Sequence, residues 1–144
     1  LLGPNLFERF VLPHLKRLVD LGHDYGLKVQ MHCCGGFEPL IPDLIEIGLD
    51  ALHAVQPSCH GMDLAALKAA YGEKMVLNGG IDSHHVLIEG TPESVRESTR
   101  EVLEIMMPGG GFVAGASHDW VLEETPVENM VAMADAVREF GEYE

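Results

Sequence analysis

The chain has 144 residues, 47% of them hydrophobic and 22% charged, with a formal net charge of −14 at pH 7. This composition predicts one globular domain, residues 1–144, and the acidic balance argues against binding to nucleic acid or to an anionic membrane surface. Glu8 and Arg9 interrupt the N-terminal apolar run, so no transmembrane segment is expected. Three cysteines are too few for a disulfide framework, which favours a reducing, cytoplasmic setting.

Helical and strand segments alternate along the chain. Apolar spacing predicts a first helix over residues 5–25, divided by Pro13, because a proline ring does not fit inside a helix. Asp63, Thr91 and Thr125 stand where a side-chain oxygen can cap a helix, and a capping box is predicted at the last of them. The other helices are expected over residues 39–47, 63–72, 91–107 and 125–140, and strands over residues 27–33, 50–56, 75–78 and 112–116.

This order of elements predicts an α/β fold. Four strands alternating with about five helices are expected to be parallel and joined by right-handed crossovers. We interpret the pattern as the parallel-stranded half of a TIM (β/α) barrel, and an open, doubly wound sheet is the alternative. Both architectures place functional groups at the carboxyl ends of the strands. The residues found at those ends are His32 and Cys34, Gln56, Asp82, and His118.

The segment Val-Gln-Met-His-Cys-Cys-Gly-Gly, residues 29–36, is a predicted strand that ends in soft-metal ligands. Side chains alternate along a strand, so His32 and Cys34 project from one side and Cys33 from the other. An imidazole and a thiolate together suit a zinc ion or an activated thiol. We therefore predict a metal or thiol site at His32 and Cys34 and a core position for Cys33. The alternative is that both cysteines are small buried hydrophobes.

The other strand ends carry further candidates. His118, beside Asp119, is predicted to be a metal ligand or an acid–base group. Asp82 is a candidate for catalysis or substrate orientation, and a turn or helix cap is the equal alternative for an aspartate after two glycines. Gln56 is a candidate substrate contact. The remaining histidines of the strands and helices have no partner pattern, and we expect no functional role for them: His14, His23, His53, His84 and His85.

Six short motifs follow one another along nearly the whole chain: His32-Cys-Cys-Gly35, Gly79-Gly-Ile-Asp82, Gly90-Thr-Pro-Glu93, Gly110-Gly-Phe112, Ser117-His118 and Thr125-Pro-Val-Glu-Asn129. In this order they resemble the C-terminal half of the uroporphyrinogen decarboxylase superfamily, which includes corrinoid-dependent methyltransferases acting on thiols. Members of the superfamily are full TIM barrels. The resemblance therefore implies that the N-terminal half of the barrel is absent from this sequence.

The His-x-Cys-Gly pattern resembles the methyltransferase branch, in which the histidine and cysteine bind zinc together with a cysteine near the end of the last strand. The resemblance implies that His32 and Cys34 are zinc ligands and that a corrinoid is the methyl-carrying partner or substrate. His118 and its neighbours stand at the last-strand position here, so His118 is the expected third ligand. The Ser117-His118 pair also resembles the Gly-His of the decarboxylases, where the histidine contacts the substrate.

The leading function is accordingly a zinc-dependent methyltransferase that moves a methyl group between a corrinoid and a thiol. The first alternative is a uroporphyrinogen decarboxylase of porphyrin biosynthesis, which needs an arginine cluster. With nine Lys and Arg residues here, that cluster would have to come from the missing half. The second alternative is an inactive, truncated fragment that binds a tetrapyrrole or nothing. A half-barrel leaves open sheet edges, so the fragment is expected to form homo-oligomers.

Overall fold

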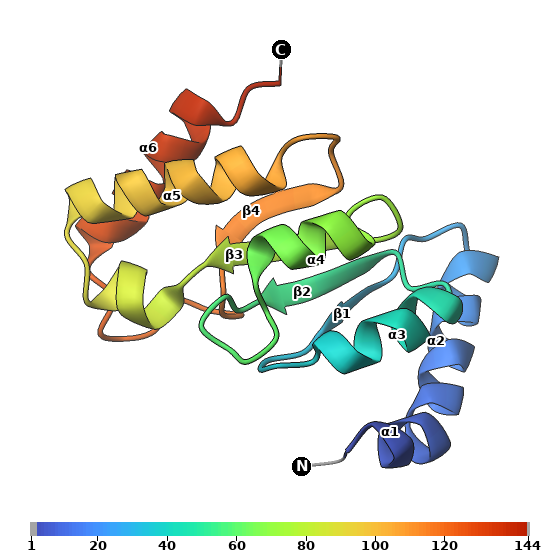
Figure 1. Ribbon diagram of the computed structural model, residues 1–144. Helices are drawn as coiled ribbons and strands as arrows, with labels where there is room; N and C mark the ends of the chain where they lie inside the picture. Colours follow the sequence, from blue (N-terminus) through green and yellow to red (C-terminus); the bar gives the residue numbers. More distant parts are fainter. Residues whose placement is uncertain (1–2, 144) are drawn as a thin grey trace.

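The computed structural model describes residues 3–143, and its four strands form one parallel sheet. The spatial order of the strands equals their order in the chain, and all four arrows point the same way in Figure 1. The predicted α/β fold with a parallel sheet is confirmed. The strands are β1 (Gln30–His32), β2 (Ala51–Val55), β3 (Val76–Ile81) and β4 (Phe112–Ala116).

The helices connect and cover the strands. They are more numerous than expected because the first predicted helix is broken at Val11, and Pro13 lies in the first turn of the second piece, where its missing N–H group is harmless. No helix within residues 3–143 combines the length and apolarity needed to cross a bilayer. The helices are α1 (Pro4–Phe10), α2 (Leu12–Asp24), α3 (Ile41–Glu46), α4 (Leu64–Tyr71), α5 (Pro92–Met106) and α6 (Val127–Phe140), with a 3-10 turn at Glu38–Leu40 and a π-helical segment at Ser83–Ile88.

Two of the three predicted helix caps are confirmed. Asp63 accepts a hydrogen bond from the Ala66 backbone N–H at 2.8 Å, and Thr91 forms a reciprocal capping box at the start of α5. The capping box predicted at Thr125 is wrong, because α6 begins one residue later, after Pro126, and has no side-chain cap. Asn129 then occupies the third helical position, and its side-chain amide donates hydrogen bonds to the backbone carbonyls of Leu87 and Gly90, each at 2.9 Å.

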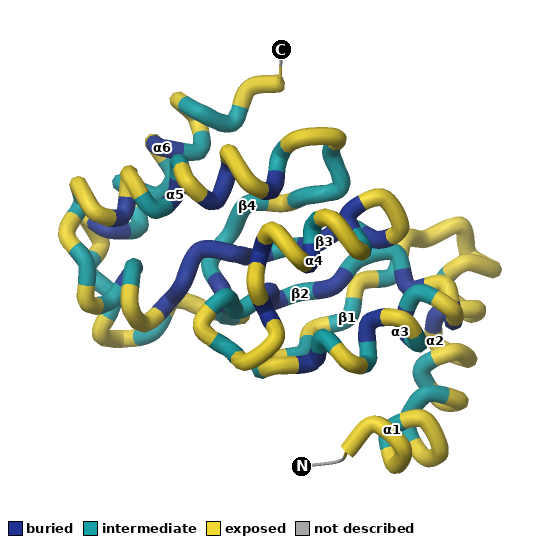
Figure 2. Tube along the Cα trace, viewed as in Figure 1, coloured by how far each residue is buried: buried dark blue, intermediate teal, exposed yellow. Residues whose placement is uncertain are grey.

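Helices α3, α4 and α5 cover one face of the sheet (Figure 1). Leu52 of β2 and Leu77 of β3 point to this side and are fully buried, together with Ile41 and Leu44 of α3. Figure 2 shows that β2 and β3 are the most buried strands, whereas α1 is exposed. Burial of each such side chain contributes about 1.5–3 kcal/mol, so this layer supplies much of the stability of the domain.

The opposite face of the sheet is open and partly polar. Asn78 of β3 donates a hydrogen bond to Gln30 of β1 at 3.1 Å, and both side chains lie on this face. Val113 of β4 is in register with Asn78 on this face and is 49% exposed. In a closed barrel this face would be the interior, so the structure leaves an inner surface uncovered.

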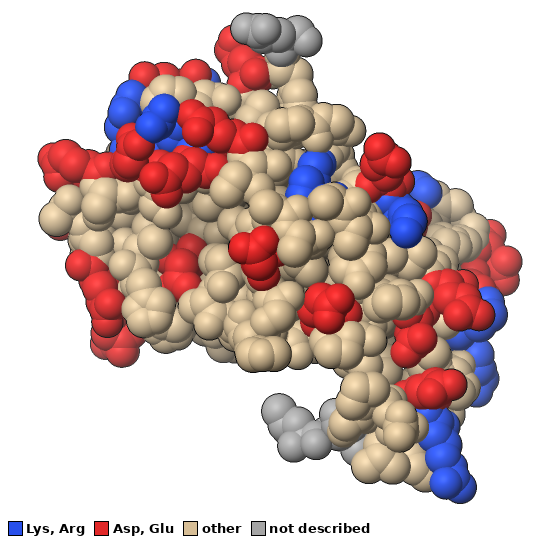
Figure 3. All heavy atoms as spheres, viewed as in Figure 1, with Lys and Arg blue, Asp and Glu red and all other residues tan. Residues whose placement is uncertain are grey.

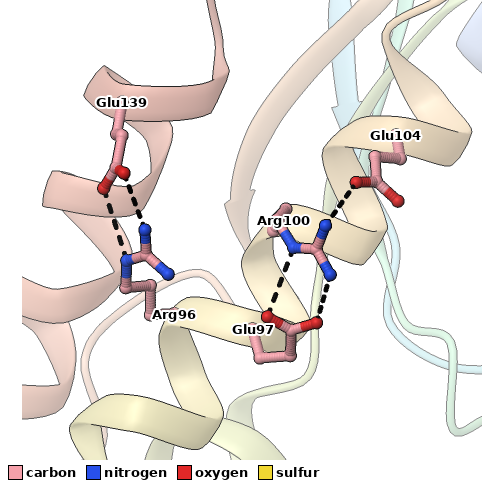
Figure 4. Close-up of polar contacts among 5 residues, drawn as sticks. All are labelled: Arg96, Glu97, Arg100, Glu104 and Glu139. Atoms are coloured by element: carbon pink, nitrogen blue, oxygen red, sulfur yellow. Dashed lines mark hydrogen bonds and ion pairs between the residues drawn. The ribbon is translucent and has the colours of Figure 1, made fainter.

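Helices α5 and α6 pack side by side at the end of the chain. Arg96 of α5 donates two hydrogen bonds to Glu139 of α6, at 2.6 and 3.3 Å (Figure 4). Arg100 pairs with Glu97 and Glu104 along α5 itself. These groups are about half exposed, and pairs of this kind contribute only about 0–1 kcal/mol each. The Arg96–Glu139 pair joins the two helices, while both Arg100 pairs lie within α5.

Candidate functional site at the carboxyl edge of the sheet

Two histidines meet at the ends of neighbouring strands. His32 is the last residue of β1, and the parallel register pairs it with His53 of β2. Their Nδ1 atoms are 2.9 Å apart, and the ring centroids are 4.9 Å apart with the planes inclined at 52°. The His53 side chain is largely buried and that of His32 is 36% exposed. The pair lies on the open face of the sheet, where solvent reaches it.

Asp119, in the loop after β4, brings a carboxylate to this pair. Its Oδ1 atom is 3.7 Å from the Nδ1 atom of His32 and 3.7 Å from that of His53. Burial lowers the pKa of His53, and the neighbouring rings of His32 and His118 lower it further, while Asp119 partly opposes them. This shift favours the neutral imidazole, which is the form that binds metals. Two imidazoles and a carboxylate can hold a divalent cation here.

Cys34 lies on the other side of the His32 ring. Its Sγ atom is 3.0 Å from His32 Nε2, and the residue is exposed. Cys33 instead packs against the hydrophobic core, as the alternation of side chains predicts. Burial raises the pKa of the Cys33 thiol, and the neighbouring Cys34 raises it further. Cys33 thus packs, partly buried, against the core, whereas Cys34 is exposed.

His118 and Gln56 lie at the same edge of the sheet and make different contacts. The His118 ring makes an edge-on contact with Trp120 at 5.6 Å between centroids, and its Nδ1 atom faces the Trp120 backbone N–H at 3.5 Å. Gln56 accepts a hydrogen bond from the Gly35 backbone N–H, which ties the loop after β1 to the end of β2. The predicted roles of His118 as a metal ligand and of Gln56 as a substrate contact stay predictions.

Asp82 is buried at the end of β3 and caps the π-helical segment that follows. Its Oδ1 atom accepts hydrogen bonds from the backbone N–H groups of His84 and His85, both at 2.8 Å. Burial alone would raise the pKa of Asp82, but the hydrogen bonds from Ser58, His85 and His84 lower it on balance. The carboxylate is already engaged in the fold. Its predicted catalytic and substrate-orienting roles stay predictions.

Replacing Asp82 with alanine should lower the free energy of unfolding by about 0.5–2 kcal/mol at pH 7, as loss of a helix cap does. Because the folded state lowers the pKa of Asp82, its contribution is present above the unfolded pKa of about 3.9 and is lost as pH falls through the folded value. Urea denaturation at several pH values measures this. Asp24→Ala, at an exposed helix end, is the control. Equal pH dependence of stability in D82A and the unaltered chain would contradict the assignment.

No functional role was predicted for His53 from the sequence, whereas the structure places it in the candidate site beside His32. His53 lies in a predicted strand and alternates with the buried residues Leu52 and Ala54. The face of the sheet from which its side chain projects was therefore predictable. Its contact with His32 depends on the register between β1 and β2, which periodicity does not reveal. Asp119 was noted only as a neighbour of His118.

Parallel strands with imidazole, thiol and carboxylate groups at their carboxyl edge define an α/β barrel-type domain, and those groups could hold a metal ion. The sequence profile described as uroporphyrinogen decarboxylase (URO-D) matches residues 1–140. The chain belongs to this family, as the motifs predicted.

The relatives include both branches of the family. The chain is 24% identical to the methylcobamide:CoM methyltransferase MtbA of Methanosarcina acetivorans, over 97% of this chain and 38% of that protein. It is 27% identical to the methylated-thiol–coenzyme M methyltransferase of Methanosarcina mazei, over 98% of this chain and 39% of the other. A uroporphyrinogen decarboxylase of Pseudoalteromonas translucida is 27% identical over 97% of this chain and 38% of its own length.

A solved structure, a methyltransferase from Methanosarcina mazei, superposes with a TM-score of 0.75 and 24% identity, covering 99% of this chain and 39% of that chain. This likeness confirms the partial TIM-barrel fold. The chain spans about two fifths of the length of the relatives it matches.

Proposed function

We propose that this chain is part of a zinc-dependent methyltransferase that moves a methyl group between a corrinoid and a thiol. The observation that carries the proposal is the cluster of His32, His53, Asp119 and Cys34 at the carboxyl edge of the sheet. Relatives named as methyltransferases, matched over nearly the whole chain, support the same reaction class. The activity is proposed for the whole protein, of which the chain holds one side of the site.

The transfer needs a thiolate, because the sulfur must supply the electron pair of the new bond. The carbon–cobalt bond of the methylated corrinoid breaks, its electron pair stays on cobalt, and the methyl carbon bonds to sulfur. Zinc, when bound, lowers the pKa of a coordinated thiol and so supplies the thiolate at neutral pH. The thiol proton must leave, and His118, at the same edge of the sheet, is the proposed acceptor. Gln56 and Asp82 are proposed to line the substrate side of the site.

Two ligand sets for the metal contain His32. The set predicted from the sequence adds Cys34 and His118. The set that the structure brings together adds His53 and Asp119, whose ligand atoms and that of His32 all lie within 4.8 Å of one another. His32 is common to both sets, so the proposed function depends on His32 whichever set binds.

The decarboxylase alternative is less well supported by this chain. An acidic tetrapyrrole requires cationic groups beside the site, as any polycarboxylate does. The five arginines lie within α1, α2, α5 and α6, and three of them pair with carboxylates there: Arg96, Arg100 and Arg138. Figure 3 shows acidic side chains spread over the face it draws, beside the few basic ones. The arginine cluster that a decarboxylase needs would therefore have to come from outside this chain, whereas the imidazole, thiol and carboxylate groups of the methyltransferase proposal lie within it.

The proposed function is tested with the full-length gene product, methylcobalamin and coenzyme M. We expect loss of the methylated corrinoid and formation of the methyl thioether, abolished by a chelator and restored by zinc. Uroporphyrinogen is the comparison substrate. Decarboxylation of uroporphyrinogen without methyl transfer would replace this proposal with the alternative.

The 144-residue chain is expected to self-associate. Its inner sheet face is open, and the edge beside β1 exposes large apolar side chains: Leu18 at 61%, Leu21 at 53% and Leu27 at 61%. Contiguous exposed apolar groups and open strand edges drive association. Light scattering over a range of concentrations should show dimers or larger species, and L18K/L21K should shift them toward the monomer. A monodisperse monomer of the unaltered chain at high concentration would contradict this.

A further inference from the structure

We infer that His53 is a positioning residue, which fixes the nitrogen of His32 that stays free to face Cys34. This deepens the proposed function and rests on it for the use of His32 and Cys34 in methyl transfer. The role itself rests on three observations: the register that pairs His32 with His53, the hydrogen bond between their rings, and the contact of His32 with Cys34. His53 acts through His32 and not on the substrate.

The His32 ring is held at both of its nitrogens. Its Nδ1 atom is 2.9 Å from His53 Nδ1, and its Nε2 atom is 3.0 Å from Cys34 Sγ. The Asp119 carboxylate also lies near Nδ1, but its Oδ1 atom is 3.7 Å away from either ring, which is too long for a hydrogen bond. His53 thus supplies the hydrogen bond at Nδ1 of His32.

The direction of this hydrogen bond follows from the second contact. A neutral imidazole carries hydrogen on one nitrogen and a lone pair on the other, so the two Nδ1 atoms share one hydrogen. If His32 donates it, Nε2 keeps a lone pair toward Cys34, and the thiol S–H can donate to that lone pair. If His53 donates it, the hydrogen of His32 lies on Nε2 and faces sulfur, which is a weak acceptor. The first arrangement satisfies both contacts, so His32 donates from Nδ1 and His53 accepts.

This arrangement directs the Nε2 lone pair of His32 and the sulfur of Cys34 toward each other. A metal-bound histidine usually donates its other ring N–H to a carboxylate, a carbonyl or water, which fixes its tautomer and orientation. An imidazole takes that place here. His53 is suited to it because its own position is fixed within β2, between the buried residues Leu52 and Ala54, and its side chain is 14% exposed against 36% for His32.

The first test needs no substitution at His53. The full-length protein is labelled with nitrogen-15 in its histidines and studied without metal at about pH 8, above the ordinary histidine pKa of about 6.5. Long-range proton–nitrogen correlation spectra show which ring nitrogen carries hydrogen, and H32A and H53N identify the signals of the two rings by their loss. We expect hydrogen on Nδ1 of His32 and on Nε2 of His53. Hydrogen on Nε2 of His32 would overturn the inference.

Two variants of similar shape give the second test, because they separate the hydrogen bond from the ring. Asparagine places an acceptor oxygen near the position of Nδ1, whereas leucine has the same branched shape without a polar atom. In the full-length protein H53N should keep zinc affinity within about 3-fold, and H53L should lower it by about 10- to 100-fold, the usual effect of losing such a partner. H14L, on the exposed side of α2, is the control.

The pattern across these variants decides the role of His53. An equal loss of zinc affinity in H53N and H53L would overturn the inference, because the imidazole ring itself would then be required. Full zinc affinity in H53L would overturn it as well. Circular dichroism shows whether each variant folds, and the spectra of the unaltered protein decide if H53L does not. The expected spectra and zinc affinities, without methyl transfer by the full-length protein, would remove only the proposed function.

Discussion

Replacing His32 with alanine should remove both zinc and methyl transfer. His32 belongs to either ligand set, so its loss leaves at most two protein ligands and should weaken zinc binding by more than about 100-fold, beyond the effect of losing an outer group. In the full-length protein kcat should fall in proportion to bound zinc. Elemental analysis and the rate of consumption of methylcobalamin are the two measurements. The histidine at position 14 is exposed on α2, and H14A should change neither.

Zinc should also stabilise the folded chain, and this stabilisation should disappear with His32. A ligand that binds only the folded state at 100 times its dissociation constant adds about 2.7 kcal/mol to the free energy of unfolding. Thermal unfolding with and without zinc therefore reports binding independently of activity. The unaltered chain should unfold at a higher temperature with zinc, and H32A should not respond. An equal response of both proteins to zinc would place the metal elsewhere in the molecule.

The fold was predictable from the sequence because its signals are local. Alternation of apolar strands with helices, and caps such as Asp63, depend on residues a few positions apart. Element bounds were less predictable. β1 is shorter than the predicted strand because an edge strand extends only as far as it pairs with its one neighbour, here β2. β3 extends beyond the predicted strand through Gly79 and Gly80, which pair with β4.

The site was only partly predictable because its contacts are long-range. The projection of His32 and Cys34 from one side of β1 follows from alternation alone. The meeting of His32 with His53 requires the register of two strands, and that of both with Asp119 requires the whole sheet and the loop after β4. These relations are set by packing, and no spacing within one segment encodes them.

Gly79 lies where β2 and β3 approach closely, next to the site. It has φ of +121°, and a Cβ atom there would be 2.8 Å from the backbone N of Val55 and 3.1 Å from its O. The β2–β3 register shifts between His53 and Val55, opposite Gly79. Side chains disfavour positive φ, and the contacting atoms belong to backbone, which cannot rotate away. Only glycine permits this approach, and the approach helps to set the position of His53.

Gly79→Ala should therefore destabilise the chain strongly and disturb the metal site. Positive φ costs about 1–2 kcal/mol for alanine, and the forced displacement of β2 adds about 1–3 kcal/mol. Gly109→Ala is the matched control, since Gly109 also has positive φ, +79°, but has nothing within 4 Å of an added Cβ. Urea denaturation should show a clearly larger loss for G79A than for G109A, and only G79A should weaken zinc binding by moving His53. Equal losses of unfolding free energy in the two variants would mean that β2 can move aside without destabilising the fold. The close approach at Gly79 would then not hold His53 in place.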